Sequence, residues 1–359
     1  MNRVYNFSAG PATLPLEVLQ IAQNEFLDYK GSGMSIIESS HRSPQYDEIN
    51  DSCIALTKEI FGLGDKHQVL FMGGGASTQF AMVPMNFLLP GTTAAYVNSG
   101  AWSKKAIKEA KNIGNVHVAA TSEDANFNFI PKNLDVPSDA VYLHLTSNNT
   151  IFGTQYQKFP EANVPLVCDM SSDIGSRVHD FSKFDLIYAG AQKNIGPAGV
   201  TLIIISEEML SKCNEKVPTM LSYQTHAKKK SLFNTPPVFS IYMMKLVFEW
   251  IKKQGGLPAI EKANLAKQER VYQIIDLYPD YYKGTAVPED RSWMNITFRL
   301  PSEELEKKFI AEAKANKMSG LKGHRDVGGI RVSTYNAMSL EGIDCLVGFM
   351  EQFKKDNPA

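Results

Sequence analysis

Asp169 and Lys193 are the two residues whose types and positions could carry chemistry. Asp169 ends the short apolar segment 164–168, and Lys193 lies in a turn rich in Gly and Pro between the apolar segments 186–191 and 200–205. A lysine held at the end of a buried strand can form a Schiff base with a carbonyl group. The alternative is that Lys193 extends from the tip of a hairpin into solvent, as most lysines do.

The acid favours the first interpretation, because an acid and a lysine at neighbouring strand ends are the pair that pyridoxal phosphate (PLP) needs. The lysine holds the aldehyde, and the acid keeps the pyridine nitrogen protonated so that the ring accepts electrons from a substrate carbon. One strand-length segment separates Asp169 from Lys193, which suits adjacent strands of one sheet. An acid at a strand end is also common in nucleotide-binding folds, so the pair alone leaves that alternative open.

Polar residues or glycine follow the apolar, strand-like segments that end near Gly73, Asn98, Asn148, Asp169 and Lys193. Helical spacing of apolar residues appears between the earlier segments, and also over 16–29 and 44–61. This alternation predicts an α/β fold with a mostly parallel sheet. Because ligands bind outside the carboxyl ends of such strands, we expect the site along one edge of the sheet.

A glycine pair at Gly255 and Gly256 marks a break in the chain. We expect an irregular N-terminal arm over 1–14, a large PLP-binding domain over 15–256 and a small C-terminal α/β domain over 257–359. The small domain would begin with a long helix over 257–277. Its other elements are predicted as a strand over 293–300, a helix over 303–316, a strand over 330–333 and a helix over 340–354.

Two helix starts in the large domain could bind a phosphate. The glycine turn 73–75 precedes an apolar helix, and free backbone N–H groups and the helix dipole at such a place suit an anion. Ser77 could cap this helix and donate its hydroxyl as well. Asn234 and Thr235 precede two prolines and the apolar helix 240–253, where an N-cap and an anion site are expected. The glycine turn could instead serve only to turn the chain.

Three further positions have two interpretations each. Trp102 follows a strand end, so its ring either packs in the core or stacks on a planar cofactor. His41 and Arg42 precede the helix 44–61, either as part of a polar loop or as contacts to an anion. Arg331 lies in an apolar strand, where an unpaired guanidinium would be costly and a ligand carboxylate would relieve that cost.

The composition limits the possible functions. Of 359 residues, 43% are hydrophobic and 21% charged, with a net charge of −1, which is ordinary for a globular protein and indicates neither nucleic acid nor an anionic membrane as partner. The four cysteines are scattered, which argues against a zinc site or a disulfide framework. No apolar run approaches the roughly 20 residues that span a bilayer. The N-terminus lacks the apolar core of a signal peptide, so we expect a cytoplasmic protein. From the scattered cysteines we expect no bound metal.

Taken together, these segments are similar to the phosphoserine aminotransferases, a family of class V PLP enzymes with fold type I. The resemblance covers nearly the whole chain and implies a mostly parallel seven-stranded sheet between helices. It rests on Trp102 and on the motifs NFSAGPA (6–12), SHRS (40–43), GGGASTQF (73–80), NNTIFGT (148–154), DMSS (169–172), YAGAQKNIGPAG (188–199), NTPP (234–237), GHR (323–325) and GIRVSTYNA (329–337).

The resemblance also implies residue roles. Lys193 would bind PLP, Asp169 would pair with the pyridine nitrogen, Trp102 would stack on the ring, and Thr150 would lie by the ring hydroxyl. The phosphate would be held by Ala76, Ser77 and Gln192 and, from the partner subunit of a homodimer, by Asn234 and Thr235. The substrate would be bound by Ser8, His41, Arg42, His324, Arg325 and Arg331. Among the last six, Arg331 would take the α-carboxylate and the two His-Arg pairs the distal anion. Some family members carry an Arg in the glycine turn, where this chain has Ser77.

The implied reaction is reversible transamination between L-glutamate and 3-phosphohydroxypyruvate, which gives O-phospho-L-serine and 2-oxoglutarate. Lys193, once displaced from the cofactor, would be the general base that moves the α-proton. Two alternatives remain. One is another class V enzyme, such as an alanine–glyoxylate aminotransferase or a cysteine desulfurase, although Cys345 lies in a helical pattern rather than in the mobile loop that a desulfurase needs. The other is a non-catalytic PLP-fold binding protein.

Overall fold

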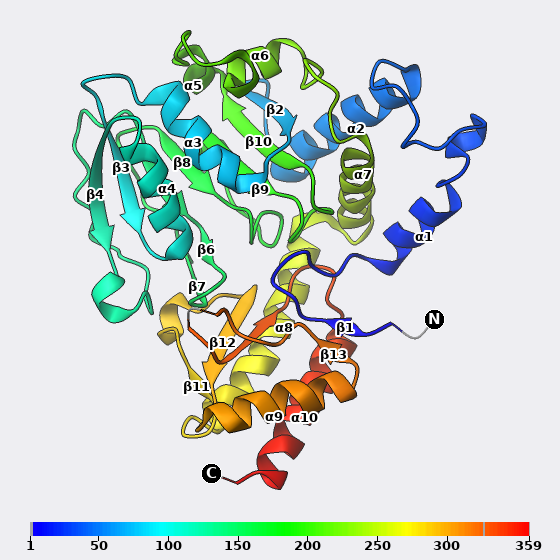
Figure 1. Ribbon diagram of the computed structural model, residues 1–359, viewed down its shortest axis with the longest axis vertical. Helices are drawn as coiled ribbons and strands as arrows, with labels where there is room; N and C mark the ends of the chain where they lie inside the picture. Colours follow the sequence, from blue (N-terminus) through cyan, green and yellow to red (C-terminus); the bar gives the residue numbers. More distant parts are fainter. Residues whose placement is uncertain (1–2, 326, 359) are drawn as a thin grey trace.

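A seven-stranded sheet lies at the centre of the larger part of the molecule (Figure 1). The computed structural model describes residues 3–325 and 327–358. The strand order is β2 (His67–Met72), β10 (Thr201–Ser206), β9 (Leu186–Gly190), β8 (Leu166–Asp169), β5 (Leu143–Thr146), β3 (Thr93–Asn98) and β4 (Asn115–Thr121). Strand β10 runs antiparallel to both of its neighbours, β2 and β9, and all other adjacent pairs in this sheet are parallel. The predicted α/β fold with a mostly parallel seven-stranded sheet is therefore confirmed.

Both faces of this sheet are buried, which explains why its strands read as continuous apolar runs. In β2, Val69 and Phe71 belong to one hydrophobic core, and Leu70 and Met72 belong to another on the opposite face. The first core contains residues of helices α2 (Pro44–Phe61) and α7 (Val238–Lys253). The second contains residues of α3 (Gly75–Phe87) and α4 (Ala101–Lys111). The sheet thus forms the middle of three layers.

Helix α2 has the bounds that its sequence predicts, because both of its ends carry strong signals. At the start, the Ser43 side chain accepts a hydrogen bond from the Tyr46 backbone N–H, and Pro44 occupies the first turn. At the end, Gly62 adopts a left-handed conformation with φ of 62°. Helix α1 (Leu16–Asn24) is shorter than the 16–29 prediction. The apolar residues Phe26 and Leu27 beyond it are 42% and 82% exposed, so they continue no buried helix face.

The smaller part of the molecule has its own sheet and its own core. Its three antiparallel strands are β11 (Lys283–Gly284), β12 (Asn295–Arg299) and β14 (Ile330–Ser333), and its helices are α8 (Gly256–Leu277), α9 (Glu303–Ala315) and α10 (Leu340–Asp356). In Figure 1 this part is yellow to red and lies below the large sheet, with α8 running between the two. Helix α8 packs against both α7 and α10, so it links the two parts.

The N-terminal arm is not wholly irregular, contrary to the prediction. Its strand β1 (Tyr5–Asn6) pairs in parallel with β13 (Met318–Ser319), and Phe7 is fully buried in the core of the smaller part. Pairing satisfies the backbone groups beside Phe7, since Phe7 N donates to Ser319 O at 2.8 Å. A two-residue strand is too short to leave an alternating pattern in the sequence.

The remaining elements are short. They are the strands β6 (Asn148–Asn149) and β7 (Thr154–Gln155), the helices α5 (Glu207–Ser211) and α6 (Tyr223–Lys228), and the 3₁₀ turns Tyr29–Gly31, Glu123–Ala125, Phe181–Lys183, Thr219–Leu221 and Pro288–Asp290. Over residues 3–325 and 327–358, no helix has the length and apolar character needed to cross a membrane. The same residues contain no group of three His, Cys, Asp or Glu side chains arranged to hold a metal.

Candidate active site

A cavity of about 300 Å³ lies where the carboxyl ends of the parallel strands meet. The large sheet, the N-terminal arm and strand β14 all contribute to its wall. Its lining residues are Ala9, Gly10, Gly75, Ala76, Ser77, Phe80, Trp102, Thr146, Asn148, Thr150, Asp169, Ser171, Ser172, Gln192, Lys193, His324 and Arg331. The expected position of the site, at the carboxyl edge of the sheet, thus coincides with a cavity that holds both Asp169 and Lys193.

Asp169 and Lys193 follow adjacent parallel strands. Asp169 ends β8 and lies in register with Tyr188 of β9, and Lys193 follows the end of β9 at Gly190. Burial lowers the pKa of Lys193 to about 8, against the opposing influence of Asp169, and the nearby Arg331 lowers it further. Burial also raises the pKa of Asp169, which a hydrogen bond from Ser171 and the charge of Lys193 counteract. The cavity therefore contains a reactive amine and a carboxylate that favours a cationic partner.

Trp102 presents its ring beside the lysine. The Lys193 Nζ atom lies 5.5 Å from the centroid of the Trp102 ring. The indole Nε1 donates a hydrogen bond to Thr150 Oγ1 at 2.9 Å, which fixes the plane of the ring. Because the Thr150 hydroxyl accepts from the indole, its own proton is free to be donated to an oxygen atom in the cavity. The pair offers a flat surface for stacking and one oriented hydrogen-bond donor.

Helix α3 points its N-terminus at the cavity, and its first residues, Gly75, Ala76 and Ser77, line the wall. The first N–H groups of a helix lack partners within it and favour an anion. Ser77 does not cap the helix, contrary to the prediction, because Gly74 is the N-cap residue. Glycine is required at position 74: its φ is +90°, and a Cβ atom there would lie 2.1 Å from Thr78 Oγ1.

The guanidinium group of Arg331, a residue of the smaller part of the molecule, also lines the cavity. Arg331 lies on β14 and donates from Nη1 to the Thr150 carbonyl oxygen at 3.1 Å. Its Nε atom is buried and has no hydrogen-bond partner among the described residues. Burial lowers the pKa of Arg331, which reflects the cost of keeping this guanidinium charged without an acid. A carboxylate in the cavity would supply the missing acceptor.

The other predicted residues lie in three places. Ser8 and Arg325 adjoin the lining residues Ala9 and His324 without lining the cavity themselves. His41 and Arg42 lie in the turn that precedes α2, and Arg42 is exposed. Asn234 and Thr235 are exposed ahead of α7. Within the described part of one chain, none of these six residues lines the cavity.

Asn234 and Thr235 are not at the N-cap of α7, contrary to the prediction. Pro237 is the N-cap residue, and the helix begins at Val238. A residue that precedes proline avoids the helical conformation, so the two prolines keep Thr235 outside the helix.

Sequence reasoning assigned no role to several residues around Asp169. Ser171 donates its backbone N–H to Asp169 Oδ1 at 2.9 Å, and its hydroxyl accepts from Gly190 N at 3.1 Å, so it ties the ends of β8 and β9 together. Asn148 donates from Nδ2 to Ser172 Oγ and to Asn295 Oδ1, both at 2.8 Å. The available signal was the run of small polar residues directly after each strand.

The arm passes over the lysine. Ala12 N donates to the Gln192 carbonyl oxygen at 2.8 Å, and a Cβ atom on Gly10 would lie 3.4 Å from Lys193 Cγ. A Cβ atom at position 10 would thus be in van der Waals contact with Lys193, and the φ of +141° is one that residues with a side chain rarely adopt.

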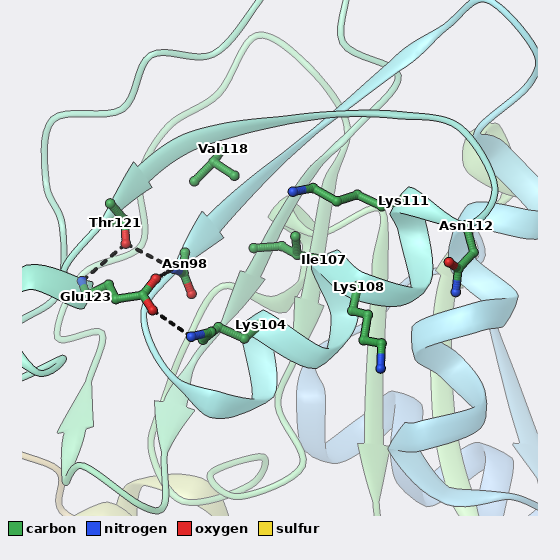
Figure 2. A pocket seen from close by; sticks show the side chains of 9 residues that line it. All are labelled: Asn98, Lys104, Ile107, Lys108, Lys111, Asn112, Val118, Thr121 and Glu123. Atoms are coloured by element: carbon green, nitrogen blue, oxygen red, sulfur yellow. Dashed lines mark hydrogen bonds and ion pairs between the residues drawn. The ribbon is translucent and has the colours of Figure 1, made fainter.

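A larger open cavity of about 530 Å³ lies between α4 and the end of β4. Figure 2 shows the Lys104 side chain turned toward Glu123, with Nζ 2.6 Å from Oε1. Asn98 Nδ2 donates to Thr121 Oγ1 and to Glu123 Oε2, both at 3.0 Å. None of the predicted catalytic or binding residues lines this cavity. The smaller cavity is therefore the candidate active site.

Comparison with known proteins agrees with this geometry. Residues 4–346 match the family described as aminotransferase class-V. A phosphoserine aminotransferase of Desulfatibacillum aliphaticivorans is 56% identical over 359 residues, which cover 99% of both chains. The structure of phosphoserine aminotransferase from Bacillus circulans subsp. alkalophilus has a TM-score of 0.97 and 51% identity, with 99% of each chain covered. The PLP-bound phosphoserine aminotransferase from Trichomonas vaginalis has a TM-score of 0.93 and 36% identity, with 97% of this chain and 100% of that chain covered. The chain therefore belongs to the aminotransferase class-V family and, within it, to the phosphoserine aminotransferases.

Proposed function

We propose that the protein is a PLP-dependent phosphoserine aminotransferase. It transfers an amino group reversibly between L-glutamate and 3-phosphohydroxypyruvate, and the products are O-phospho-L-serine and 2-oxoglutarate, as in serine biosynthesis. The observation that carries this proposal is the meeting of Asp169 and Lys193 in one cavity, in a chain that is 56% identical over its length to a relative of that name.

The donor set of the cavity fits PLP group by group. The Lys193 amine suits the aldehyde, the Asp169 carboxylate suits a protonated pyridine nitrogen, and the Trp102 face suits the ring. The N-terminal end of α3 suits the phosphate, together with Gln192. When bound, PLP supplies a ring that accepts electrons from the substrate α-carbon.

Lys193 is the residue that binds the cofactor and then acts as general base. Its lowered pKa, about 8, keeps a useful fraction of the amine neutral near pH 8. A neutral amine can accept the α-proton of an amino acid and later donate it again. Asp169 remains ionised against the positive ring nitrogen, because that cation offsets the effect of burial on the carboxylate.

Arg331 binds the α-carboxylate of the substrate through its buried, unpartnered Nε and its remaining donors. A distal phosphate or carboxylate needs a second cationic contact, which we assign to His324, which lines the cavity, and to Arg325, which follows it in sequence. A guanidinium group can donate paired hydrogen bonds to a phosphate or to a carboxylate. One pocket can therefore bind glutamate and phosphoserine in turn.

The protein is a cytoplasmic homodimer whose second chain completes each site. Of the six site residues that do not line the cavity of their own chain, four are also remote in sequence from any lining residue: His41, Arg42, Asn234 and Thr235. Exposed apolar side chains occur in the same stretches of sequence: Phe26, Leu27, Met34, Ile37 and Phe233, with 42%, 82%, 46%, 51% and 42% of their surface exposed. The Phe26 ring also packs on Phe239 at the start of α7, with centroids 6.0 Å apart. A second copy would cover this apolar surface and bring the four polar residues to its partner's cavity.

We divide the chain into an arm over 1–14, a large domain over 15–256 and a small domain over 257–359. Separate hydrophobic cores support this division, since the core under β12 and β14 takes Phe7 from the arm and otherwise residues from Val271 onward. Leu257 and Ile260, in the first turns of α8, pack instead in a core of the large domain. Helix α8 is thus the structural link between the domains.

The test is a visible absorption spectrum of the PLP-loaded protein, titrated with glutamate and, separately, with phosphoserine. Either amino acid should remove the band of the aldehyde form, and 3-phosphohydroxypyruvate should restore it. A band that responds to alanine but not to phosphoserine would identify another class V aminotransferase. A band that responds to no amino acid would identify a binding protein, and the proposal would then be wrong.

A further inference from the structure

Lys267 is a buried cation that the proposed reaction does not use. It lies in the middle of α8 and is 1% exposed. Its Nζ atom donates to three consecutive backbone carbonyl oxygens, those of Thr334 at 2.9 Å, Tyr335 at 2.8 Å and Asn336 at 3.4 Å. No carboxylate in the described part of the chain forms an ion pair with it.

Burying the ammonium group of Lys267 costs free energy, so we expect this residue to have a role in the structure around it. Burial lowers the pKa of Lys267 to about 7, because the charged form of the amine is less stable away from water. A buried ammonium persists only where polar groups replace its water, and here three carbonyl oxygens do so. Removing the lysine would leave those three buried acceptors without their donor.

The segment 334–336, which Lys267 holds, contacts the active site at two points. Asn336 N donates to Asn194 Oδ1 at 3.0 Å, and Asn194 is the residue that follows Lys193. Tyr335 OH donates to the Ala9 carbonyl oxygen at 2.9 Å, and Ala9 lines the cavity in the arm that crosses Lys193. The segment also begins directly after β14, the strand that carries Arg331.

A second side chain of α8 supports the same segment. Asn264 donates from Nδ2 to Asn336 Oδ1 and to the Ser176 carbonyl oxygen, both at 2.8 Å. Asn336 Nδ2 in turn donates to the Gly175 carbonyl oxygen at 2.9 Å. One short segment of the small domain is thereby joined to α8, to the loop after β8 and to the turn that holds Lys193.

We propose that Lys267 is a positioning residue, which clamps the segment 334–336 and so fixes the distance between Arg331 in the small domain and Lys193 in the large domain. The two residues act on neighbouring groups of the amino acid, since Arg331 binds its α-carboxylate and Lys193 takes the proton from the α-carbon. Their separation must therefore stay constant while the substrate reacts. This inference rests on the proposed roles of Arg331 and Lys193.

The test compares Lys267→Met with wild type and with Lys262→Met, which replaces an exposed lysine on the same helix. In protein without PLP, hydrogen exchange of the segment around Asn336 should become faster in Lys267→Met. The hydrogen bond from the Asn336 backbone N–H to the Asn194 side chain would open more often. Exchange in α10 should stay as in wild type, which separates a local effect from general destabilisation.

Two measurements on the PLP-loaded protein follow. The kcat/KM for glutamate should fall by about 10-fold to about 100-fold. The pH midpoint of the visible band should rise, because the charge of Arg331 disfavours a positive charge on the nitrogen of Lys193 and a displaced Arg331 would disfavour it less. Lys262→Met should match wild type in every measurement.

If Lys267→Met does not fold, Asn264→Ala provides the test, because it removes two hydrogen bonds from the same network and leaves the cation in place. Asn264→Ala should make hydrogen exchange around Asn336 faster and raise the pH midpoint of the visible band, and both changes should be smaller than in Lys267→Met. A folded Lys267→Met, or failing that Asn264→Ala, with wild-type exchange and a wild-type midpoint overturns the inference. A wild-type protein whose band does not respond to glutamate would refute the proposed function instead, and the exchange comparison would still test the clamp.

Discussion

The Lys193 Nζ atom lies 5.5 Å from the centroid of the Trp102 ring, whose own N–H is held by Thr150 at 2.9 Å. A buried amine and a fixed aromatic face therefore adjoin the same cavity. Asp169 completes the set at the end of the neighbouring strand.

Asp169→Asn should slow removal of the α-proton by about 100-fold or more, while cofactor affinity falls by only about tenfold. A neutral amide cannot keep the pyridine nitrogen protonated, and that charge matters most in the transition state. Single-turnover kinetics with glutamate, followed at the visible band, measure the first effect, and equilibrium titration with PLP measures the second. Asp139→Asn, at an exposed position, serves as the control. An unchanged single-turnover rate would remove the role assigned to Asp169.

The rate at which the protein without cofactor takes up PLP should depend on pH through Lys193. Only the neutral amine attacks an aldehyde, and the lysine pKa of about 8 means that the neutral fraction grows between pH 7 and 9 and then levels off. For an ordinary lysine the rise would continue beyond about pH 10. Arg331→Met removes a charge that lowers this pKa, so its plateau should begin at higher pH. Absorbance after rapid mixing gives the rates, and a wild-type rise that continues past pH 10 would contradict the assignment.

Selectivity for a phosphorylated substrate should depend on Arg42 and Arg325. Loss of one charge-assisted contact costs about 1.5–3 kcal/mol, so Arg42→Ala or Arg325→Ala should lower kcat/KM for phosphoserine by roughly 10-fold to 150-fold. The spectrum of bound PLP should not change. Arg270→Ala is the matched control, because Arg270 pairs with Asp344 on the surface of the small domain. If both variants prefer phosphoserine over alanine as strongly as wild type does, the anion site lies elsewhere.

Subunit complementation tests whether Asn234 and Thr235 act on the partner's site. Lys193→Ala chains and chains with both Asn234→Ala and Thr235→Ala should each have little activity alone. After mixing and subunit exchange, half of the dimers contain one intact site, so activity should recover to about a quarter of wild type. No recovery, despite exchange shown by sedimentation, would mean that the two residues act within their own chain. A fully active monomer would exclude the homodimer altogether.

Elements with strong local signals could be predicted from the sequence. Helix α2 has its predicted bounds because Ser43, Pro44 and Gly62 mark its two ends. The rule that ligands bind at carboxyl ends of parallel strands was enough to predict from the sequence that Asp169 and Lys193 lie together. Strand β1 could not be predicted, because its pairing with β13 joins residues more than 300 positions apart.

The rest of the site depends on contacts that local sequence does not encode. Lys267 lies in no chemical motif, and its role appears only in the fold, where its amine donates to three carbonyl groups of the segment 334–336, which follows β14. The prediction for Asn234 and Thr235 located the anion site at a helix start, but the pair Pro236-Pro237 moves the start of α7 beyond them. In the proposed homodimer, whether they reach a cavity depends on the contact between two chains, which local sequence does not encode.

The measurement that tests the central claim most directly is the identity of the lysine that binds PLP. Borohydride reduction of the loaded protein should fix one pyridoxyl group on the peptide that contains Lys193, as read by mass spectrometry. Lys193→Ala should fold, bind the cofactor without covalent attachment and take no label. Lys267, whose pKa is also lowered by burial but which faces backbone carbonyls, should take none in either protein. Label on Lys267 or any other lysine, or no label at all, would contradict the account.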